Sequence, residues 1–322
     1  MNFVGIVALL ATTGTSGFPN RAAIDSAVRV QVDSGFSGVV LVEHHGRVVL
    51  EHAYGSSHPG NDTSSVFWIG SITKEFTAGV ILKLASRGLL SLGDSVGHFV
   101  HDAPDDKKAI TIRQLLTHTA GIDGRSAGFS YTDRDSAVKA ILTQPLFAKP
   151  GTSYRYNDDD YELLAALAEI VSGVKWEKLV NDLLIKPAGL YHTGFWSGPQ
   201  KDWGHKGANG MSSTAGDLLR WTRMLRSGRV LTAREVRAIE GPQIFVRHSG
   251  AEQVYYGFGT RVYQRNGRTT EVFHSGSSDD GNTSVIRELA NGVTIIVLSR
   301  AGQHAGTTWS SYVAQHLPID DR

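Results

Sequence analysis

The feature that most constrains the fold is the separation of strand-like and helix-like segments along the chain. β-branched runs lie near both ends, and the long middle carries helical patterns. Residues 38–43 and 47–54 flank the short turn His45-Gly46, which predicts a β-hairpin. Further strands are expected in the C-terminal third, at residues 256–264, 270–274, 283–288 and 292–299, with turns at Asn266-Gly267 and Asn291-Gly292.

The middle of the chain predicts a helix that is buried on all sides. Residues 73–87 are apolar on nearly every face, and a helix with no polar stripe belongs in a core. Other helices are expected at residues 112–118, 135–142, 161–172, 176–184 and 214–226. Two more are expected outside the middle, at residues 22–32 before the hairpin and at residues 307–317 at the end of the chain.

This distribution predicts an α+β fold, in which both chain ends build one antiparallel sheet and a mainly helical subdomain is inserted between them. We expect a single catalytic domain over residues 21–322. Its sheet part would comprise about residues 21–65 and 250–322, and its helical part about residues 66–249. A site in the cleft between the two parts would draw residues from both.

The N-terminus predicts a signal peptide within residues 1–20. Residues 3–11 form a short apolar run, and small and polar residues follow up to residue 17. No Lys or Arg precedes the run, so a frayed segment or a misassigned start is the alternative. Export would make the protein secreted or periplasmic. No other segment approaches about 18 uninterrupted apolar residues, so we expect no stable membrane insertion.

Composition narrows the function classes. The net charge is +1, from 32 basic and 31 acidic residues without a long run of either sign, so we expect no nucleic-acid partner. Cysteine is absent, which excludes disulfides, thiolate metal sites and cysteine nucleophiles. The pairs His44-His45 and His98/His101 lack a third ligand at a recognisable spacing. No phosphate-binding or dinucleotide loop is found, so we expect neither a metal nor a cofactor.

Ser71 and Lys74 are candidates for nucleophilic catalysis. Positions three apart on a helix share a face, so the lysine amine can approach the serine oxygen. A serine at the start of a helix also lies near the positive end of the helix dipole, which favours an oxyanion.

The Ser-x-x-Lys spacing by itself is weak evidence, because it also occurs at Ser136/Lys139 and Ser172/Lys175. For those two pairs we expect surface polar residues, since Ser136 lies in a polar helix and Ser172 precedes Gly173 at a helix end. Ser71 differs because an apolar stretch leads into it and a buried helix leads away.

Short motifs lie at residues 67–77, 88–94, 112–121, 150–156, 187–190, 207–217, 256–259 and 274–276. Together they resemble the family of class C β-lactamases and D-alanyl-D-alanine carboxypeptidases, which also holds the family VIII esterases. The motifs are found in the family's order and extend over nearly everything after about residue 35. The resemblance implies a β-lactamase/transpeptidase-like fold, which matches the expected sheet with a helical insert.

The resemblance assigns roles to further residues. The family's tyrosine-any-asparagine motif falls on Tyr156-Asn157-Asp158, so Tyr156 would act as general base or acid. Asp158 stands where the family has asparagine, and its negative charge would keep Lys74 protonated and shift the base role toward Tyr156. The alternatives are a core tyrosine for Tyr156 and an acidic loop residue for Asp158. His118, within another motif, is read as structural.

The third family motif, lysine-threonine-glycine in the β-lactamases, falls on His274-Ser275-Gly276. Histidine is compatible with the carboxypeptidase and esterase branches, whereas losing the lysine weakens the β-lactamase interpretation. By resemblance, the backbone N–H groups of Ser71 and Ser277 form an oxyanion hole. Arg261, on the preceding strand, is either a ligand for a substrate carboxylate or a solvated arginine at a strand edge.

The sequence therefore predicts a serine hydrolase that cleaves an ester or amide of a small-molecule or peptide substrate through an acyl-Ser71 intermediate. D-alanyl peptides and small esters are the expected substrates. A β-lactamase is the alternative among enzymes, and a non-catalytic penicillin-binding sensor or scaffold is the alternative from another class. The acyl donor depends on loop shape, which one sequence does not define.

Overall fold

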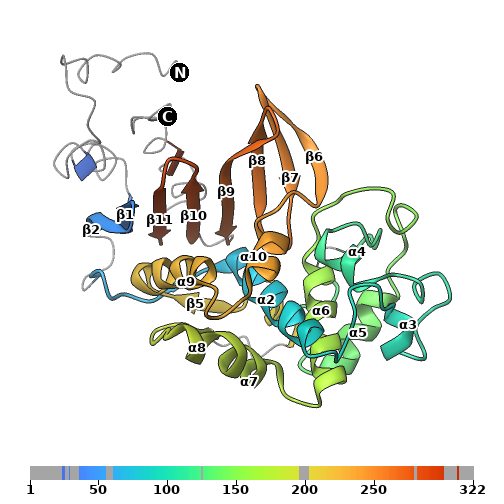
Figure 1. The fold of residues 1–322 in the computed structure, drawn as a ribbon. Coiled ribbons are helices and arrows are strands. Elements are labelled where there is room, and N and C mark those ends of the chain that lie inside the picture. Colours follow the sequence, from blue (N-terminus) through green and yellow to red (C-terminus); the bar gives the residue numbers. More distant parts are fainter. Residues whose placement is uncertain are drawn as a thin grey trace, which may run out of the picture.

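An antiparallel sheet of eight strands dominates the part of the chain that the structure describes (Figure 1). The structure is a computed structural model, and it describes residues 24–25, 29, 36–55, 61–124, 126–195, 203–278, 281–300 and 310–311. Across the sheet the strands follow the order β2 (Arg47–Tyr54), β1 (Gly38–His44), β11 (Val293–Ser299), β10 (Thr283–Leu289), β9 (Arg268–Ser277), β8 (Arg261–Arg265), β7 (Glu252–Tyr256) and β6 (Ile244–Ser249).

The two ends of the chain meet in this sheet, because β1 pairs with β11 from Gly38↔Ser299 to His44↔Val293. Both strands are buried along almost their whole length. Val39 packs into the large core on one face, and Val40 packs into a smaller cluster on the other. Alternation of this kind follows from the two-residue period of a strand. The expected fold class, an antiparallel sheet from both chain ends with a mainly helical insert, is therefore confirmed.

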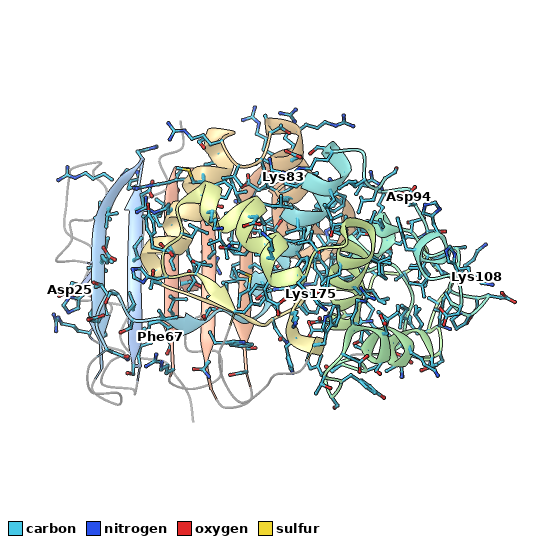
Figure 2. All side chains as sticks on the ribbon, turned by 90° about the horizontal axis from the view of Figure 1, so that it is seen from below. Asp25, Phe67, Lys83, Asp94, Lys108 and Lys175 are labelled. Carbon is cyan, nitrogen blue, oxygen red and sulfur yellow. The ribbon has the colours of Figure 1, made fainter. Side chains whose placement is uncertain are left out.

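Helices fill the middle of the described chain. They are α2 (Thr73–Ser86), α3 (Val96–Phe99), α4 (Ile112–Leu116), α5 (Arg134–Leu142), α6 (Asp158–Ser172), α7 (Trp176–Val180) with the π-helix η2 (Asn181–Ile185), α8 (Lys186–Ala188), α9 (Ala215–Ser227) and α10 (Ala233–Ile239), together with the 3-10 turns η1 (Gly70–Ile72) and η3 (Trp203–His205). In Figure 1, α3 to α6 gather at the end of the molecule away from β1 and β2. Viewed from below in Figure 2, Asp25 and Lys108 mark these opposite ends.

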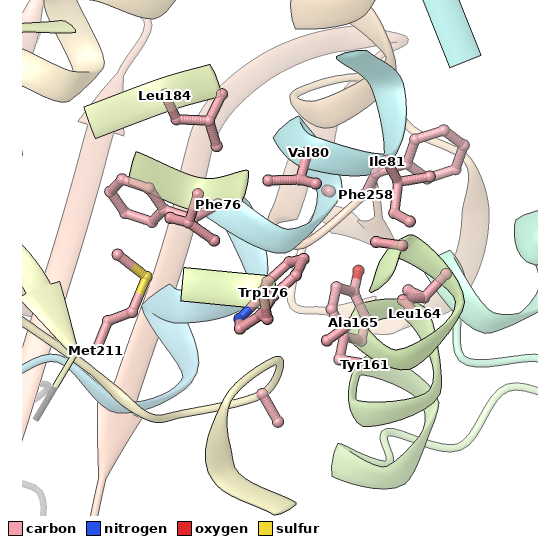
Figure 3. Packing of buried hydrophobic residues seen from close by; sticks show 14 of the residues in the cluster. Phe76, Val80, Ile81, Tyr161, Leu164, Ala165, Trp176, Leu184, Met211 and Phe258 are labelled. Carbon is pink, nitrogen blue, oxygen red and sulfur yellow. The ribbon is translucent and has the colours of Figure 1, made fainter. Parts of the chain in front are cut away.

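The central helix α2 is buried on all sides, as its sequence predicts. Its residues from Thr73 to Leu82 are all buried, and so is Leu84. Figure 3 shows Phe76, Val80 and Ile81 of α2 in the same cluster as Tyr161 of α6 and Trp176 of α7. Because core packing surrounds α2, its first turn is held in a fixed position between the sheet and the other helices.

A second, three-stranded sheet was not expected from the sequence. Its strands β3 (Phe67–Trp68), β5 (Met211–Ser213) and β4 (Gly194–Phe195) pair in that order. They have at most three residues each, too short for a period-two pattern to stand out. β3 leads directly into the turn that carries Ser71.

The strand expected at residues 256–264 is wrong, because two strands share that stretch. β7 ends at Tyr256 and β8 begins at Arg261. A Cβ on Gly257 would lie 2.0 Å from Ile239 O, and one on Gly259, at φ +85°, would lie 2.7 Å from Lys74 O. The two glycines therefore let the chain turn against α10 and α2. The sheet also starts earlier than residue 250, since β6 begins at Ile244.

Several sequence-based expectations fall mostly or wholly outside the described residues. The signal peptide at residues 1–20 lies wholly outside them. Of the expected helices at 22–32 and 307–317, residues 24–25, 29 and 310–311 are described, and all are helical. Among the described helices, none combines the length and apolar character needed to cross a bilayer. The division into a signal peptide and one catalytic domain stays a prediction.

Candidate active site

Ser71 lies in a tight turn just before the buried helix. It is the middle residue of η1 and is half-buried, and α2 begins two residues later. Gly70 precedes it at φ +52°, a conformation that favours glycine. A Cβ on Gly70 would also lie 2.7 Å from the ring of Trp68. The glycine thus allows the chain to turn from β3 and to present Ser71 at the start of α2.

Lys74 lies one turn further along and its side chain is fully buried. Lys74 Nζ is 3.1 Å from Ser71 Oγ, 2.6 Å from Asp158 Oδ1 and 3.0 Å from the carbonyl oxygen of Ala208. An ammonium group has three protons to donate, and three oxygens surround it here. The i, i+3 approach of lysine to serine that the sequence predicts is therefore present in the structure.

Asp158 is brought to this lysine by the start of α6. The side chain of Asn157 caps the helix by accepting from Asp159 N at 3.1 Å, so Asp158 becomes the first helical residue. Acidic residues are favoured there because the helix dipole is positive at its N-terminus. The middle residue of the Tyr156-Asn157-Asp158 motif thus has a structural role, since its cap points Asp158 at Lys74.

The surroundings of Lys74 favour its protonated form. Burial alone lowers the pKa of a lysine, but the Asp158 carboxylate and Tyr156 outweigh burial and raise the pKa of Lys74 above its usual value. This agrees with the sequence-based argument that aspartate at position 158 keeps the lysine charged. A lysine ammonium that stays protonated serves as an electrostatic partner rather than as a base.

Tyr156 lies beside the lysine, with Lys74 Nζ 4.8 Å from the centroid of its ring. Arg261 Cζ lies 5.7 Å from the same centroid. The alternative of a solvated arginine at a sheet edge is wrong, because β8 is flanked by β7 and β9 and Arg261 is half-buried. Two cationic side chains therefore lie near the Tyr156 ring.

His274 lies at the same site but is only 3% exposed. Its Nε2 is 3.3 Å from the hydroxyl of Tyr256, and its Nδ1 is 3.0 Å from Ser275 O. Burial and then the positive charge of Arg261 hold the pKa of His274 well below its usual range. A neutral, buried imidazole of this kind supports Tyr256 and does not offer a charge to a substrate.

The end of β9 passes directly over the turn of Ser71. A Cβ on Gly276 would lie 2.4 Å from Ile69 O and 2.8 Å from Gly70 Cα, so only glycine fits. Ile69 O accepts a hydrogen bond from Ser284 Oγ at 2.6 Å, which ties β10 to the same turn. Ser277, the last residue of β9, is exposed next to this contact. The two proposed oxyanion-hole residues, Ser71 and Ser277, thus each follow one of the two touching glycines.

A buried histidine–aspartate pair, His118 and Asp160, packs against the ring of Tyr156. His118 Nδ1 is 2.9 Å from Asp160 Oδ2, and the ring centroids of His118 and Tyr156 are 4.6 Å apart. Burial lowers the pKa of His118 and raises that of Asp160, each well beyond its usual value. Asn157 N also donates to His118 Nδ1 at 3.3 Å. These observations favour a neutral pair in which Asp160 donates and Nδ1 accepts.

The described residues hold no group of three or more His, Asp or Glu side chains that could bind a metal ion. The His44 and His45 rings lie 4.3 Å apart at the β1–β2 turn. In the second Ser-x-x-Lys pair, Ser136 lies in the first turn of α5 after the cap Asp133. In the third, Ser172 Oγ bonds to Ala168 O at the end of α6. Within the described part of the chain, neither serine is hydrogen-bonded to its lysine.

Sequence reasoning missed the acceptor Ala208 and the histidine partner Tyr256. Both lie in motifs that carried the family resemblance, at residues 207–217 and 256–259, but neither was assigned a role. A backbone carbonyl has no side-chain signature, so nothing in the residue type marks Ala208.

The fold and this constellation define the class of protein. An antiparallel sheet with an inserted helical part and a Ser-x-x-Lys turn at the start of a buried helix is the architecture of β-lactamases and penicillin-binding proteins. The family model described as Beta-lactamase matches residues 24–315. The chain belongs to the Beta-lactamase family.

Solved structures agree on the fold. The octameric penicillin-binding protein homologue from Pyrococcus abyssi superposes with a TM-score of 0.79 at 23% identity, over 91% of this chain and 76% of that one. A D-stereospecific amidohydrolase from Streptomyces sp. gives 0.76 at 22% identity, over 92% and 98%. EstCE1, a hydrolase with promiscuous acyltransferase activity, gives 0.77 at 19% identity, over 92% and 97%.

Among curated relatives, PbpX of Bacillus subtilis (strain 168) is 32% identical over 172 residues. The alignment covers 52% of this chain and 44% of PbpX. The chain thus matches less than half the length of that relative.

Proposed function

We propose that the chain is a serine hydrolase that cleaves an ester or amide bond through an acyl intermediate on Ser71. The observation that carries the proposal is the position of Lys74, whose ammonium lies within hydrogen-bond distance of both Ser71 Oγ and Asp158 Oδ1. A nucleophilic serine needs neighbouring groups that orient its hydroxyl and move its proton, and here the Lys74 ammonium would orient Ser71 Oγ while Tyr156 moves the proton.

In the proposed reaction, Tyr156 acts as the general base and takes the Ser71 proton while Ser71 Oγ bonds to the substrate carbonyl carbon. The negative oxygen that develops accepts from the N–H groups of Ser71 and Ser277. Tyr156 then returns the proton to the leaving group as its bond to carbon breaks. Water attacks the acyl-enzyme by the same proton transfers, which releases the acid and restores Ser71. Lys74 stays an ammonium throughout.

For the substrate we propose peptides with a C-terminal D-alanyl residue first and small acyl esters second. Arg261 supports the peptide, because its guanidinium lies near Tyr156 and suits a carboxylate. Two solved structures of the same fold, a D-stereospecific amidohydrolase and EstCE1, a hydrolase with promiscuous acyltransferase activity, support acyl transfer as the type of reaction. A β-lactamase is the weaker candidate, because His274 replaces the lysine of that branch and lies buried. Cell-wall peptides lie outside the cytoplasmic membrane, which agrees with the proposed export.

The test is intact-protein mass spectrometry with a fluorescent penicillin, and nitrophenol release from p-nitrophenyl acetate. Wild type is compared with Ser71→Ala and with the control Ser136→Ala, which removes the serine of another Ser-x-x-Lys pair. We expect Ser71→Ala to lose the adduct and to slow ester turnover by about 1000-fold or more. Ser136→Ala should behave as wild type.

The outcomes separate the candidates. A stable penicillin adduct favours the peptidase, rapid ester turnover without an adduct favours the esterase, and penicillin hydrolysis favours the β-lactamase. If wild type and Ser71→Ala behave alike with both reagents, the hydrolase proposal is wrong and a non-catalytic homologue becomes the better interpretation.

A further inference from the structure

The third oxygen that contacts Lys74 belongs to the backbone, and a second buried carboxyl group holds it in place. Glu162 of α6 is fully buried. Its Oε2 accepts from Gly207 N at 3.1 Å and its Oε1 from Ala208 N at 3.0 Å. The carbonyl of Ala208 in turn accepts from Lys74 Nζ at 3.0 Å. The backbone of Ala208 therefore links the two residues, with its N–H bonded to Glu162 and its carbonyl bonded to Lys74.

The backbone around Ala208 is fixed from two helices at once. From α2, Thr77 Oγ1 donates to Gly207 O at 2.6 Å. From α6, Tyr161 O comes so close that a Cβ on Gly207 would lie 2.2 Å from it. This segment has no regular secondary structure, so its N–H groups depend on Glu162 for partners. Removing those acceptors would leave two buried donors unsatisfied and free the Ala208 carbonyl to move.

We propose that Glu162 is a positioning residue for the acylation step, and that it acts by holding the Ala208 carbonyl against the Lys74 ammonium. The proposal rests on the proposed function. Asp158 and Glu162 lie four residues apart and so share one face of α6. The helix thus orients the lysine twice, directly through Asp158 and indirectly through Glu162 and Ala208. With both acceptors in place, the remaining ammonium proton points at Ser71 Oγ.

The effect on pH dependence follows from the same contact. A carbonyl that accepts from an ammonium stabilises its charged form, so losing the contact should allow Lys74 to lose its proton at lower pH. The titratable and charged groups that interact with Lys74 from the surrounding elements are Tyr156, Asp158, Asp160, Tyr161, His118 and His274, besides Glu162.

Two substitutions test the acceptors and the reach of the Glu162 side chain separately. Glu162→Gln keeps the size of the side chain, but it places an amide N–H₂ against a backbone N–H and removes one acceptor. Glu162→Asp keeps the carboxyl group but draws its oxygens back by one methylene. The matched control is Glu169→Gln, a buried glutamate of the same helix that accepts from Trp176 N at 2.7 Å and has no link to Lys74.

The measurement is the acylation rate constant, from the nitrophenol burst with p-nitrophenyl acetate, between about pH 6 and pH 10. We expect both Glu162 variants to acylate about tenfold more slowly or worse, with the alkaline decline at lower pH than in wild type and with KM little changed. Glu169→Gln should keep the wild-type rate and pH profile even if its melting temperature falls. Each rate is divided by the concentration of folded protein, and circular dichroism verifies that each variant is folded.

Each contrary result has one meaning. If both Glu162 variants acylate like wild type, or if Glu169→Gln is impaired equally, Glu162 has no specific positioning role. If only Glu162→Gln is slow, drawing the carboxyl oxygens back does no harm, so the reach of the side chain does not position Ala208, which also overturns the proposal. A wild-type protein that never acylates Ser71 would instead refute the proposed function, and the positioning role with it.

Discussion

Lys74 of α2 and Asp158 of α6 form an ion pair of 2.6 Å in which the lysine is fully buried and the aspartate is 22% exposed. Removing one partner of such a pair leaves a buried charge without compensation, which is costly. The pair therefore couples the nucleophile helix to the helix that follows Tyr156, and it sets the protonation state of Lys74.

The first prediction concerns this charge. Asp158→Asn should restore the residue type of the family motif and lower the pKa of Lys74, because burial then acts with less opposition. We expect the alkaline limb of the pH profile of kcat/KM for a p-nitrophenyl ester to shift to lower pH than in wild type. The control is Asp159→Asn, whose carboxyl accepts from Ala127 and Gly128 N–H instead. An unshifted profile in Asp158→Asn would contradict the role given to the ion pair.

The second prediction concerns the contact of β9 with the nucleophile turn. Gly276→Ala would insert a methyl group 2.4 Å from Ile69 O, and backbone on both sides leaves little room to adjust. We expect acylation of Ser71 to slow by about 100-fold and the protein to lose about 1–3 kcal/mol of stability. Gly194→Ala is the control, because a Cβ there meets nothing within 4 Å. Wild-type acylation by Gly276→Ala would show that this approach does not position the site.

Much of the architecture follows from local sequence patterns, and the exceptions have physical causes. The hairpin of β1 and β2 and the buried helix α2 are predicted because long periodic runs carry a strong signal. β6 and the three-stranded sheet were missed, since β6 is a half-exposed edge strand without clear alternation and the others are very short. At residues 256–264, two glycines that bend the chain were read as part of one strand.

The site was predictable only where side chains carry its chemistry. Spacing on one helix brings Ser71 and Lys74 together, whereas Tyr156 and Asp158 required the family resemblance because 84 residues separate Asp158 from Lys74. Neither residue spacing nor the family resemblance assigned a role to Glu162 or Ala208. Their link to Lys74 runs through backbone groups, whose partners depend on the fold and not on residue type.

The third prediction tests the proposed carboxylate ligand. Arg261→Gln should reduce kcat/KM by about tenfold or more for D-alanyl peptides with a free C-terminus, because it removes a charge-assisted hydrogen bond. The same peptides with an amidated C-terminus should react equally with both proteins. Arg265→Gln, on the same strand but exposed, provides the control. Equal losses for free and amidated peptides would argue against recognition of a carboxylate by Arg261.

The fourth prediction concerns stability. Glu75, next to Lys74 on α2, is buried and accepts from Trp221 Nε1 at 3.0 Å. Burial, followed by the negative charge of Glu288, raises its pKa to about 8. Glu240 adds to this effect and Arg226 opposes it. Because the folded protein holds this proton more tightly than the unfolded chain, the contribution to stability is full below the unfolded pKa of 4.5 and is lost as pH rises through about 8.

Glu75→Gln mimics the protonated side chain and can still accept from Trp221, so it should escape this loss. We expect the melting temperature of Glu75→Gln to exceed that of wild type by a growing margin as pH rises from about 4.5 to about 8. At the upper end of this range the two free energies of unfolding should differ by a few kcal/mol. Thermal unfolding across that range measures the effect, and Glu51→Gln, an exposed glutamate of β2, serves as the control. A difference that stays constant with pH would mean that Glu75 is ionised in the folded protein throughout, and that Trp221 and Arg226 compensate its charge despite burial.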